Sequence, residues 1–263
     1  MGEALGRSLQ NAGAHVLWAS DGRSTATVAR AAAAGFEDLQ TVAALSDSDV
    51  LVSICPPEHA LEVAEAVAAA GFTGVYIDAN AIAPSTATAV DAVVRRAGAT
   101  FVDGGVIGGP SAPRLFLWGD DATRVGALFG EPVSIEVLDG PAFAASSLKM
   151  MYAGWTKGTS ALLFALAAAA QALGVADALA GEWARSQPAL GPRLAAAGPS
   201  AAKAWRWRGE MHEIASTLAS VGLPSAFHDG AADIYQRLAV LRDTSNATID
   251  DVVQLLLGSD QSA

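Results

Sequence analysis

Short apolar runs alternate with alanine-rich helical stretches throughout the first half of the chain. Six runs have the length and composition of strands, and they span residues 15–20, 50–55, 74–79, 101–106, 114–118 and 134–138. Four helices are predicted between the earlier runs, at residues 3–12, 24–34, 58–70 and 84–97. This alternation predicts a doubly wound α/β fold, in which helices cover both faces of a parallel sheet.

The second half of the chain has helical patterns only. Residues 142–173 contain no proline, which predicts one long helix ending near Gly174. Further helices are predicted at residues 201–221, 226–241 and 249–257. We therefore expect an α/β domain over residues 1–139 and an all-α domain over residues 140–263.

Composition excludes several classes of function. The net charge of −11 argues against a nucleic-acid or anionic-membrane surface. A single cysteine, Cys55, excludes an internal disulfide framework. No run of apolar residues is long enough to span a bilayer, and the first residues do not form an export signal. We expect a soluble, cytoplasmic protein with a small-molecule substrate and without a bound metal.

The first residues have the pattern of a dinucleotide-binding turn running into its helix. Gly2 stands where the third glycine of Gly-x-Gly-x-x-Gly would lie, and Asp21 follows 19 residues later, near the usual position of the ribose-binding acid. The first strand of such a unit and its turn are missing from this pattern. We expect the natural product to start about ten residues upstream, the alternative being a homologue that has lost cofactor binding.

The residues after the run at 15–20, which would be the second strand of the dinucleotide-binding unit, bear on the choice of cofactor. Asp21 favours the free 2′-hydroxyl of NAD. Ser20, Arg23 and Ser24 offer hydroxyls and a guanidinium to the 2′-phosphate of NADP. The sequence favours NADP and leaves NAD open, and Arg23 is equally compatible with a solvated loop.

Four further segments resemble the 6-phosphogluconate and β-hydroxyacid dehydrogenases. They read Val-Leu-Val-Ser-Ile-Cys-Pro-Pro from residue 50, Tyr-Ile-Asp-Ala-Asn-Ala-Ile-Ala-Pro from residue 76, Phe-Val-Asp-Gly-Gly-Val-Ile-Gly-Gly-Pro from residue 101, and Ala-Ser-Ser-Leu-Lys-Met-Met-Tyr-Ala-Gly-Trp-Thr-Lys-Gly from residue 145. The resemblance implies a Rossmann-type NAD(P)-binding domain followed by a helical domain.

The resemblance also assigns the nucleotide and substrate loops. It implies that Cys55, Pro56 and Pro57 border the nicotinamide ribose and that Asn80 faces the nicotinamide, although Asn80 would also suit the N-cap or turn before the next helix. Gly108 and Gly109 belong to the segment that resembles the substrate loop. Ile107 stands there in place of the family's serine, which weakens the inference of an acid substrate.

The resemblance implies that Lys149 is the general acid/base, which exchanges a proton with the hydroxyl of the substrate. Ala145 and Ala153 replace the family's glycine and asparagine, and Tyr152 is a candidate substitute for the asparagine. Residues 149, 152, 153, 156 and 157 share one helix face by their spacing. This makes Lys157 a candidate contact for a substrate anion.

The last part of the chain resembles the C-terminal domain of phosphogluconate-dehydrogenase-like proteins. Glu210 stands where the hydroxyacid enzymes carry the acid of a Lys-Asp pair, whereas Gly209 replaces the lysine and Arg208 is a hypothetical substitute. We interpret His212 and His228 as helix-packing residues. Glu210 completes the predicted substrate residues.

The predicted function is hydride transfer between NAD(P) and a small hydroxy acid or its keto partner. Two alternatives stay open at this point. Imine reductases share the architecture and reduce C=N bonds, and the departures at Ile107 and Ala153 are compatible with them. A truncated, non-catalytic homologue is the other. We expect a homodimer, since helical domains of this family pair with each other.

Overall fold

The computed structural model describes residues 1–242, 244 and 247–258. Residue contacts divide the chain into two compact units, Met1–Met150 and Met151–Ala263. The division falls within the long helix α6 (Ala144–Ala172). Within the described residues, no helix combines the length and apolarity that crossing a membrane requires.

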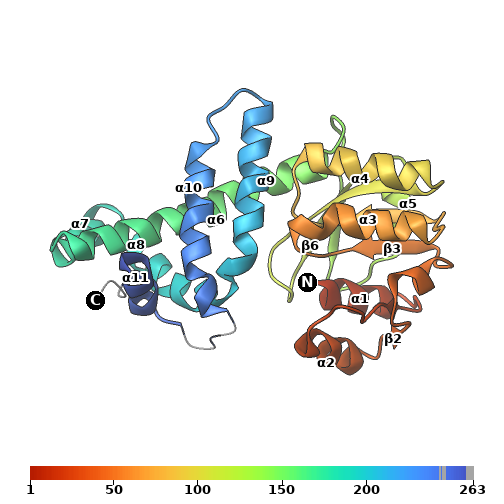
Figure 1. Ribbon diagram of the computed structural model, residues 1–263, viewed down its shortest axis with the longest axis horizontal. Coiled ribbons are helices and arrows are strands. Elements are labelled where there is room, and N and C mark those ends of the chain that lie inside the picture. The colour runs from red at the N-terminus through yellow and green to blue at the C-terminus, as the bar shows by residue number, and fades with distance from the viewer. Residues whose placement is uncertain (243, 245–246, 259–263) are drawn as a thin grey trace. The chain divides into compact units, whose positions relative to one another are not determined.

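A five-stranded sheet forms the centre of the first unit (Figure 1). Its order along the sheet follows the sequence: β3 (Val50–Ser53), β4 (Val75–Asp78), β5 (Thr100–Ile107), β6 (Arg114–Trp118) and β7 (Ser134–Val137). Strands β3, β4 and β5 are parallel, whereas β6 returns antiparallel to β5 after a short connection. The predicted α/β sheet is confirmed, with β6 and β7, which are parallel to each other, running opposite to the other three strands.

Two short strands form a separate parallel sheet, β1 (Leu17–Trp18) with β2 (Glu37–Asp38). In the doubly wound dinucleotide fold the strand order is 3-2-1-4-5-6, so the first strand lies between the second and the fourth. Here β1 and β3 correspond to the second and fourth strands, and the sheet is divided between them. Among the described residues, no strand pairs with both β1 and β3.

Helices cover both faces of the larger sheet because successive strand residues point to opposite sides. Tyr76 and Phe101 pack with α3 and α4 on one face, and Ile77 and Val102 pack with Leu5 of α1 on the other (Figure 1). The helical segments of this unit are α1 (Gly2–Asn11), α2 (Thr25–Ala34), η1 (Val42–Leu45), η2 (Pro57–His59), α3 (Ala60–Ala69), α4 (Pro84–Arg96) and α5 (Ala122–Gly126).

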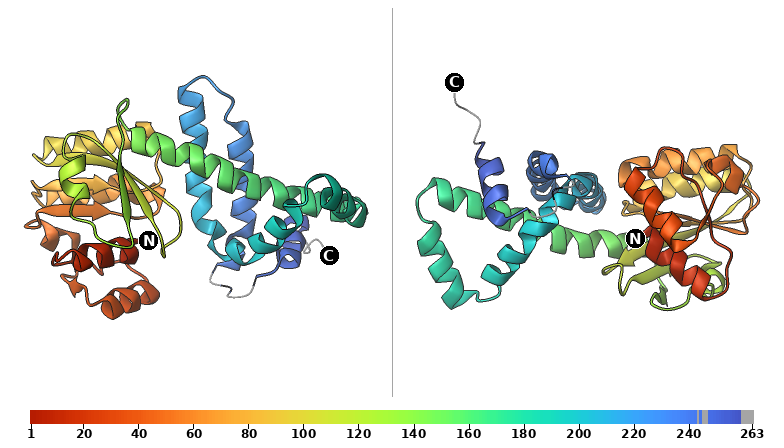
Figure 2. Two further views of the ribbon diagram at one scale, coloured as in Figure 1. Left: turned by 180° about the vertical axis from the view of Figure 1, so that it is seen from behind. Right: turned by 90° about the horizontal axis from the view of Figure 1, so that it is seen from below.

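The second unit is helical, as predicted. After α6 it contains α7 (Ala176–Ser186), α8 (Leu190–Ala197), η3 (Gly198–Arg206), α9 (Trp207–Ser220), α10 (Ala226–Arg237), η4 (Leu238–Leu241) and α11 (Ile249–Leu257). Helices α9 and α10 form an antiparallel pair (Figure 2).

The long helix predicted at 142–173 is confirmed, and Gly174 follows it with φ of +70°. The prediction of one helix over residues 201–221 is wrong in its first part. Residues 198–206 form a tighter 3₁₀ segment, and the α-helix begins at Trp207. Helices α7 and α8 lie on either side of Pro188, where the sequence indicated only a break.

Candidate functional site

A buried polar cluster lies at the carboxyl ends of β3 and β4. The Asn80 side chain is 2% exposed, and its Nδ2 donates to Ser53 Oγ (3.0 Å) and Asp78 Oδ2 (3.1 Å). Its Oδ1 accepts the backbone N–H of Cys55 at 2.6 Å. The N-cap of α4 is Ala83, so the capping alternative for Asn80 does not apply. Asn80 instead joins the end of β4 to the loop that follows β3.

The loop of Cys55, Pro56 and Pro57 follows β3 directly. Burial is the main cause that raises the pKa of the Cys55 thiol to about 12, so the thiol stays protonated at neutral pH. Pro57 is buried and begins η2. Two prolines and the bond from Cys55 N to Asn80 restrict the conformations of this loop.

Lys149 lies in the second turn of α6 and points to β5. Its Nζ donates to the carbonyl oxygen of Val106 at 2.8 Å. The strand register sets Ser53, Asp78 and Asp103 side by side, and Val106 is three residues further toward the carboxyl end of β5. The Lys149 ammonium and the Asn80 cluster therefore lie at the same edge of the sheet, where open α/β sheets bind ligands.

Two β5 residues hold the start of α6 close to the sheet. Asp103 accepts the backbone N–H of Ser146 at 3.0 Å and its hydroxyl at 2.5 Å. A Cβ on Gly105 would lie 2.6 Å from the carbonyl oxygen of Ala145 and 3.1 Å from Lys149 Cβ, so only glycine allows this approach. Sequence reasoning missed Asp103 and Ser146. The available signal was a carboxylate within an apolar strand.

The predicted substrate loop follows β5. Gly108 has φ of +98°, which favours glycine, and both Gly108 and Gly109 are exposed. Ile107 is 2% exposed and packs with Phe116 and Ala145. The position that corresponds to the family's serine is thus part of the apolar core.

Helix α1 begins at Gly2 and has no side-chain cap. A Cβ on Gly2 would have no other atom within 4 Å, whereas one on Gly6 would lie 2.4 Å from the Phe36 ring. The close helix contact therefore belongs to Gly6. Gly2 instead leaves open space beside the first N–H groups of the helix.

The turn after β1 contains the residues predicted to select the cofactor. Arg23 N donates to Ser20 O at 2.9 Å, and the Ser24 hydroxyl caps α2 by accepting Thr27 N. Asp21 and Arg23 are exposed.

Asp38, which sequence reasoning missed, lies in the neighbouring strand β2. Its Oδ1 accepts Ser20 N at 3.2 Å and Gln40 N at 2.8 Å. A hydrogen bond with the Ser20 side chain is the main cause that lowers the pKa of Asp38, and these two backbone bonds lower it further. An anionic carboxylate therefore fixes the backbone at the start of the cofactor-selecting turn.

The second unit contains the other predicted substrate residues. Lys157 Nζ forms an ion pair with Glu210, and the two side chains are only 19% and 11% exposed. The same ammonium lies 5.5 Å from the centre of the Trp207 ring. Tyr152 is 41% exposed. The charges of Lys157 and Glu210 thus compensate each other.

The two histidines make helix contacts. His228 Nε2 lies 3.3 Å from Gly154 O, and a Cβ on Gly158 would lie 3.0 Å from the same nitrogen. His212 contacts Asp229 at 3.4 Å on the surface. Among the described residues, no three His, Cys, Asp or Glu side chains are grouped as metal ligands would be.

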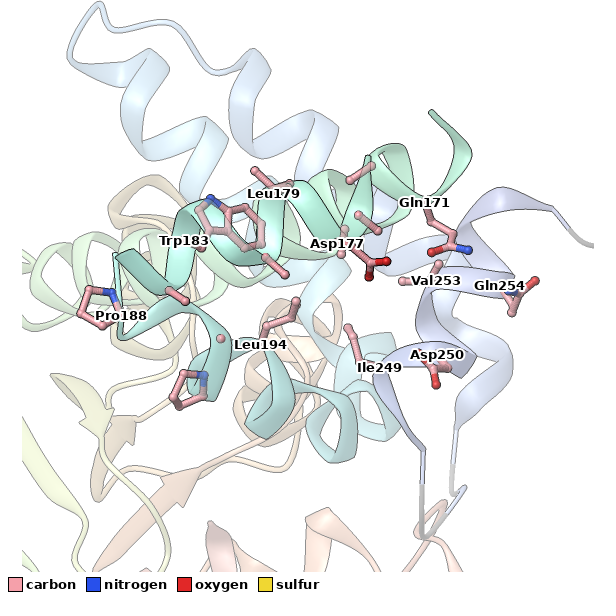
Figure 3. Close-up of a pocket in the computed structure, with 17 residues that line it drawn as sticks. Gln171, Asp177, Leu179, Trp183, Pro188, Leu194, Ile249, Asp250, Val253 and Gln254 are labelled. Carbon is pink, nitrogen blue, oxygen red and sulfur yellow. The ribbon is translucent and has the colours of Figure 1, made fainter. Parts of the chain in front are cut away.

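A pocket of about 670 Å³ lies in the second unit between α6, α7, α8 and α11 (Figure 3). Trp183, Leu179 and Leu194 form much of its apolar wall, with Asp177 and Asp250 among its polar residues. Its described lining includes none of the predicted site residues.

Comparison with known proteins gives two family matches. Residues 1–114 match the NAD binding domain of 6-phosphogluconate dehydrogenase, and residues 170–238 match a domain of unknown function, DUF1932. A curated relative, an uncharacterized 28.5 kDa protein in the 7S RNA 5′ region of Methanothermus fervidus, is 29% identical over 136 residues. That match covers 51% of this chain and 53% of the relative, so the chain matches about half of the relative's length.

Solved structures share the fold over nearly the whole chain. The conserved protein MTH1747, described as of unknown function and similar to 3-hydroxyacid dehydrogenases, is 26% identical with a TM-score of 0.64, covering 91% of this chain and 94% of that one. The Mycobacterium tuberculosis 3-hydroxyisobutyrate dehydrogenase with L-serine is 20% identical with a TM-score of 0.63, covering 97% and 95%. The chain is therefore similar to the NAD binding domain of 6-phosphogluconate dehydrogenase over residues 1–114 and to DUF1932 over residues 170–238, and it shares the fold of these two solved structures.

Proposed function

We propose that the protein is an NAD(P)-dependent oxidoreductase of the β-hydroxyacid dehydrogenase type, with Lys149 as the general acid/base. The observation that carries this proposal is the position of Lys149. Its ammonium donates to Val106 O at the carboxyl edge of the sheet, and Val106 lies within the residues that match the NAD-binding model. The proposed substrate is a small hydroxy acid or its keto partner.

The residues present are suited to a dinucleotide. The uncapped start of α1 at Gly2 presents N–H groups in open space, which suits a pyrophosphate. The exposed Arg23 guanidinium and the turn from Ser20 to Ser24 would hold the adenosine ribose and favour NADP through its 2′-phosphate. The loop from Cys55 to Pro57, fixed by Asn80, would border the nicotinamide ribose.

The bound nicotinamide would supply or accept the hydride. Lys149 would hold a proton at Nζ and exchange it with the substrate oxygen as the carbonyl forms or disappears. Val106 O already accepts one of the three ammonium hydrogens, which orients the side chain. The backbone N–H groups near Gly108 and Gly109 would approach the acid group of the substrate, because glycine adds no side chain there.

Activity assays on the purified chain test the proposal. We expect oxidation of NADPH, followed by its absorbance, with a panel of small keto acids, and reduction of NADP with the hydroxy acids. Lys149→Ala should abolish turnover while NADPH still binds, as measured by calorimetry. Lys203→Ala, which removes an exposed lysine of η3, is the matched control and should keep full activity.

The outcomes separate the candidate functions. Retained turnover in Lys149→Ala would remove this lysine from the proposed role. Turnover of cyclic imines without turnover of keto acids would favour C=N reduction instead. Absence of NADPH and NADH binding in a folded chain would contradict an enzyme and favour the non-catalytic homologue.

We further propose a cytoplasmic homodimer that does not bind nucleic acid. Large apolar side chains are exposed on the second unit, among them Leu173, Val221 and Val240 at 75%, 69% and 70%. Burial of such residues against a second copy would remove apolar surface from water. Sedimentation equilibrium tests the assembly, and a monomer with full activity would contradict it.

A further inference from the structure

We propose that Asp103 is a positioning residue, which acts through Ser146 to set the place of Lys149. This inference rests on the proposed function, because the position of Lys149 affects turnover only if Lys149 is the general acid/base. The contacts between Asp103, Ser146 and Lys149's helix do not depend on that function. The Asp103 carboxylate is fully buried in β5 and lies 43 residues before Ser146. Lys149 Nζ donates to Val106 O, so β5 contributes to fixing the position of this lysine.

The carboxylate of Asp103 serves as a cap for α6 that comes from another element. Ser146 is the third residue of α6, and the first N–H groups of a helix have no partner within it. Asp103 Oδ2 accepts the Ser146 N–H, and Oδ1 accepts the Ser146 hydroxyl. Both carboxylate oxygens are therefore bound to one residue in the first turn.

The adjoining residues of β5 complete the attachment. Gly105 allows the backbone of Ala145 to approach, and Val106 O accepts the hydrogen bond from Lys149 Nζ. Three contacts from four consecutive strand residues thus act on the first two turns of α6. Burial is the main cause that raises the pKa of Asp103, and the hydrogen bonds from Ser146 oppose that shift.

Lys149 follows Ser146 by three residues, which is less than one helical turn. A shift of the Ser146 backbone therefore carries over to the Lys149 Cα with little attenuation. If the cap is lost, the lysine side chain no longer meets Val106 O at a fixed distance. Catalytic geometry is sensitive to misplacement on the scale of one ångström. We thus assign to Asp103 an effect on turnover without contact with substrate or cofactor.

Chemical labelling of lysine measures this position without an activity assay. The sequence has three lysines, Lys149, Lys157 and Lys203, so each is resolved by peptide mass spectrometry. We expect Ser146→Ala and Asp103→Ala to raise the acetic anhydride labelling rate of Lys149 relative to Lys203 about fivefold, the factor that corresponds to one ordinary hydrogen bond. Ser147→Ala is the matched control.

The control removes a hydroxyl that serves a different contact. Ser147 Oγ donates to the carbonyl oxygen of Phe143, the residue before α6, and not to β5, so its loss should leave Lys149 labelling unchanged. Asp103→Asn keeps an oxygen for the Ser146 N–H and an amide opposite the Ser146 hydroxyl, and it should restore the wild-type rate. If Asp103→Ala does not fold, Ser146→Ala and Asp103→Asn decide the question.

Kinetics give the second measurement. We expect kcat to fall about fivefold in Ser146→Ala, with the KM for NADPH unchanged. Unchanged labelling in Ser146→Ala, or equal increases in Ser146→Ala and Ser147→Ala, would overturn the proposal. If labelling responds as expected but Lys149→Ala keeps turnover, the positioning role stands and the proposed catalytic role of Lys149 fails.

Discussion

Arg23 carries a prediction about the cofactor. Its exposed guanidinium lies in the turn after β1, near the proposed adenosine ribose. A hydrogen bond to a charged group contributes about 1.5–3 kcal/mol, and about 1.4 kcal/mol corresponds to a factor of ten. We expect Arg23→Ala to raise the KM for NADP about tenfold or more and to leave the KM for NAD unchanged.

Arg30 provides the control for this measurement, because it is another exposed arginine on α2 that bonds to Thr27. Steady-state kinetics of Arg30→Ala should match the wild type. An NADP preference that survives in Arg23→Ala would assign selection to the hydroxyls of Ser20 and Ser24.

Asp103 carries a prediction about pH. Its pKa is raised above the ordinary 3.8 by burial, so the folded state holds its proton more tightly than the unfolded state. Its contribution to stability is therefore full below about pH 3.8 and is lost as pH rises through the folded-state pKa. Urea unfolding should show that the wild type loses stability relative to Asp103→Asn as pH rises above about 4. If the free energy of unfolding varied with pH in the same way in the wild type and in Asp103→Asn, this prediction would be wrong.

At the scale of single residues, sequence patterns located Lys149 better than its partners. Lys149 was predicted from the resemblance of residues 145–158 to the β-hydroxyacid dehydrogenases, and its catalytic role stays a prediction. The link between Asp103 and Ser146 joins residues far apart in the chain, and no local pattern predicts which serine a buried carboxylate meets. The pairing of Lys157 with Glu210 was missed for the same reason, since the two residues lie on different helices.

Helix α6 illustrates what patterns predict at the scale of elements. A long stretch without proline and a final glycine were enough to give its bounds within two residues. Residues 198–206 were harder because Gly198 and Pro199 begin a tighter 3₁₀ segment that has the same composition as a helix. The run at residues 15–20 was predicted as a strand, and β1 covers only Leu17–Trp18 of it, whereas the two-residue strand β2 that pairs with β1 was not predicted.

The ion pair between α6 and α9 gives a prediction at this scale. Glu210→Leu would leave the half-buried Lys157 ammonium without its counter-charge, and removal of one partner of a buried pair costs about 3 kcal/mol. We expect a loss of about 2 kcal/mol or more in the free energy of unfolding. The double variant Lys157→Met with Glu210→Leu should recover most of it.

Chemical denaturation of the four proteins of this double-mutant cycle gives the coupling energy. Glu182→Leu is the control, since its pair with Arg185 is exposed and should change stability by less than about 1 kcal/mol. A Glu210→Leu protein as stable as wild type would show that the pair does not hold α6 and α9 together.

At the scale of the whole molecule, the divided sheet is the main structural feature. The described strands leave β1 and β3 at sheet edges, and an unpaired edge is a template for another strand. We expect an N-terminal extension that supplies one apolar strand followed by Gly-x-Gly-x-x to join the two sheets.

The chain with this extension is compared with the chain without it by melting temperature and by affinity for NADPH, and both values should rise. A matched extension with its apolar residues replaced by serine should change neither. An apolar extension that leaves both values unchanged would show that the two sheets do not accept a strand between them.

The edge of β3 also predicts how fast its backbone exchanges hydrogen with the solvent. In a parallel pair, alternate N–H groups of a strand point toward its neighbour and the others point away. Those of β3 that point away from β4 meet no strand among the described residues, whereas the amides of β4 lie between two strands. Deuterium should therefore enter alternate positions of Val50–Ser53 by local fluctuation, while Val75–Asp78 should exchange only when the whole unit opens.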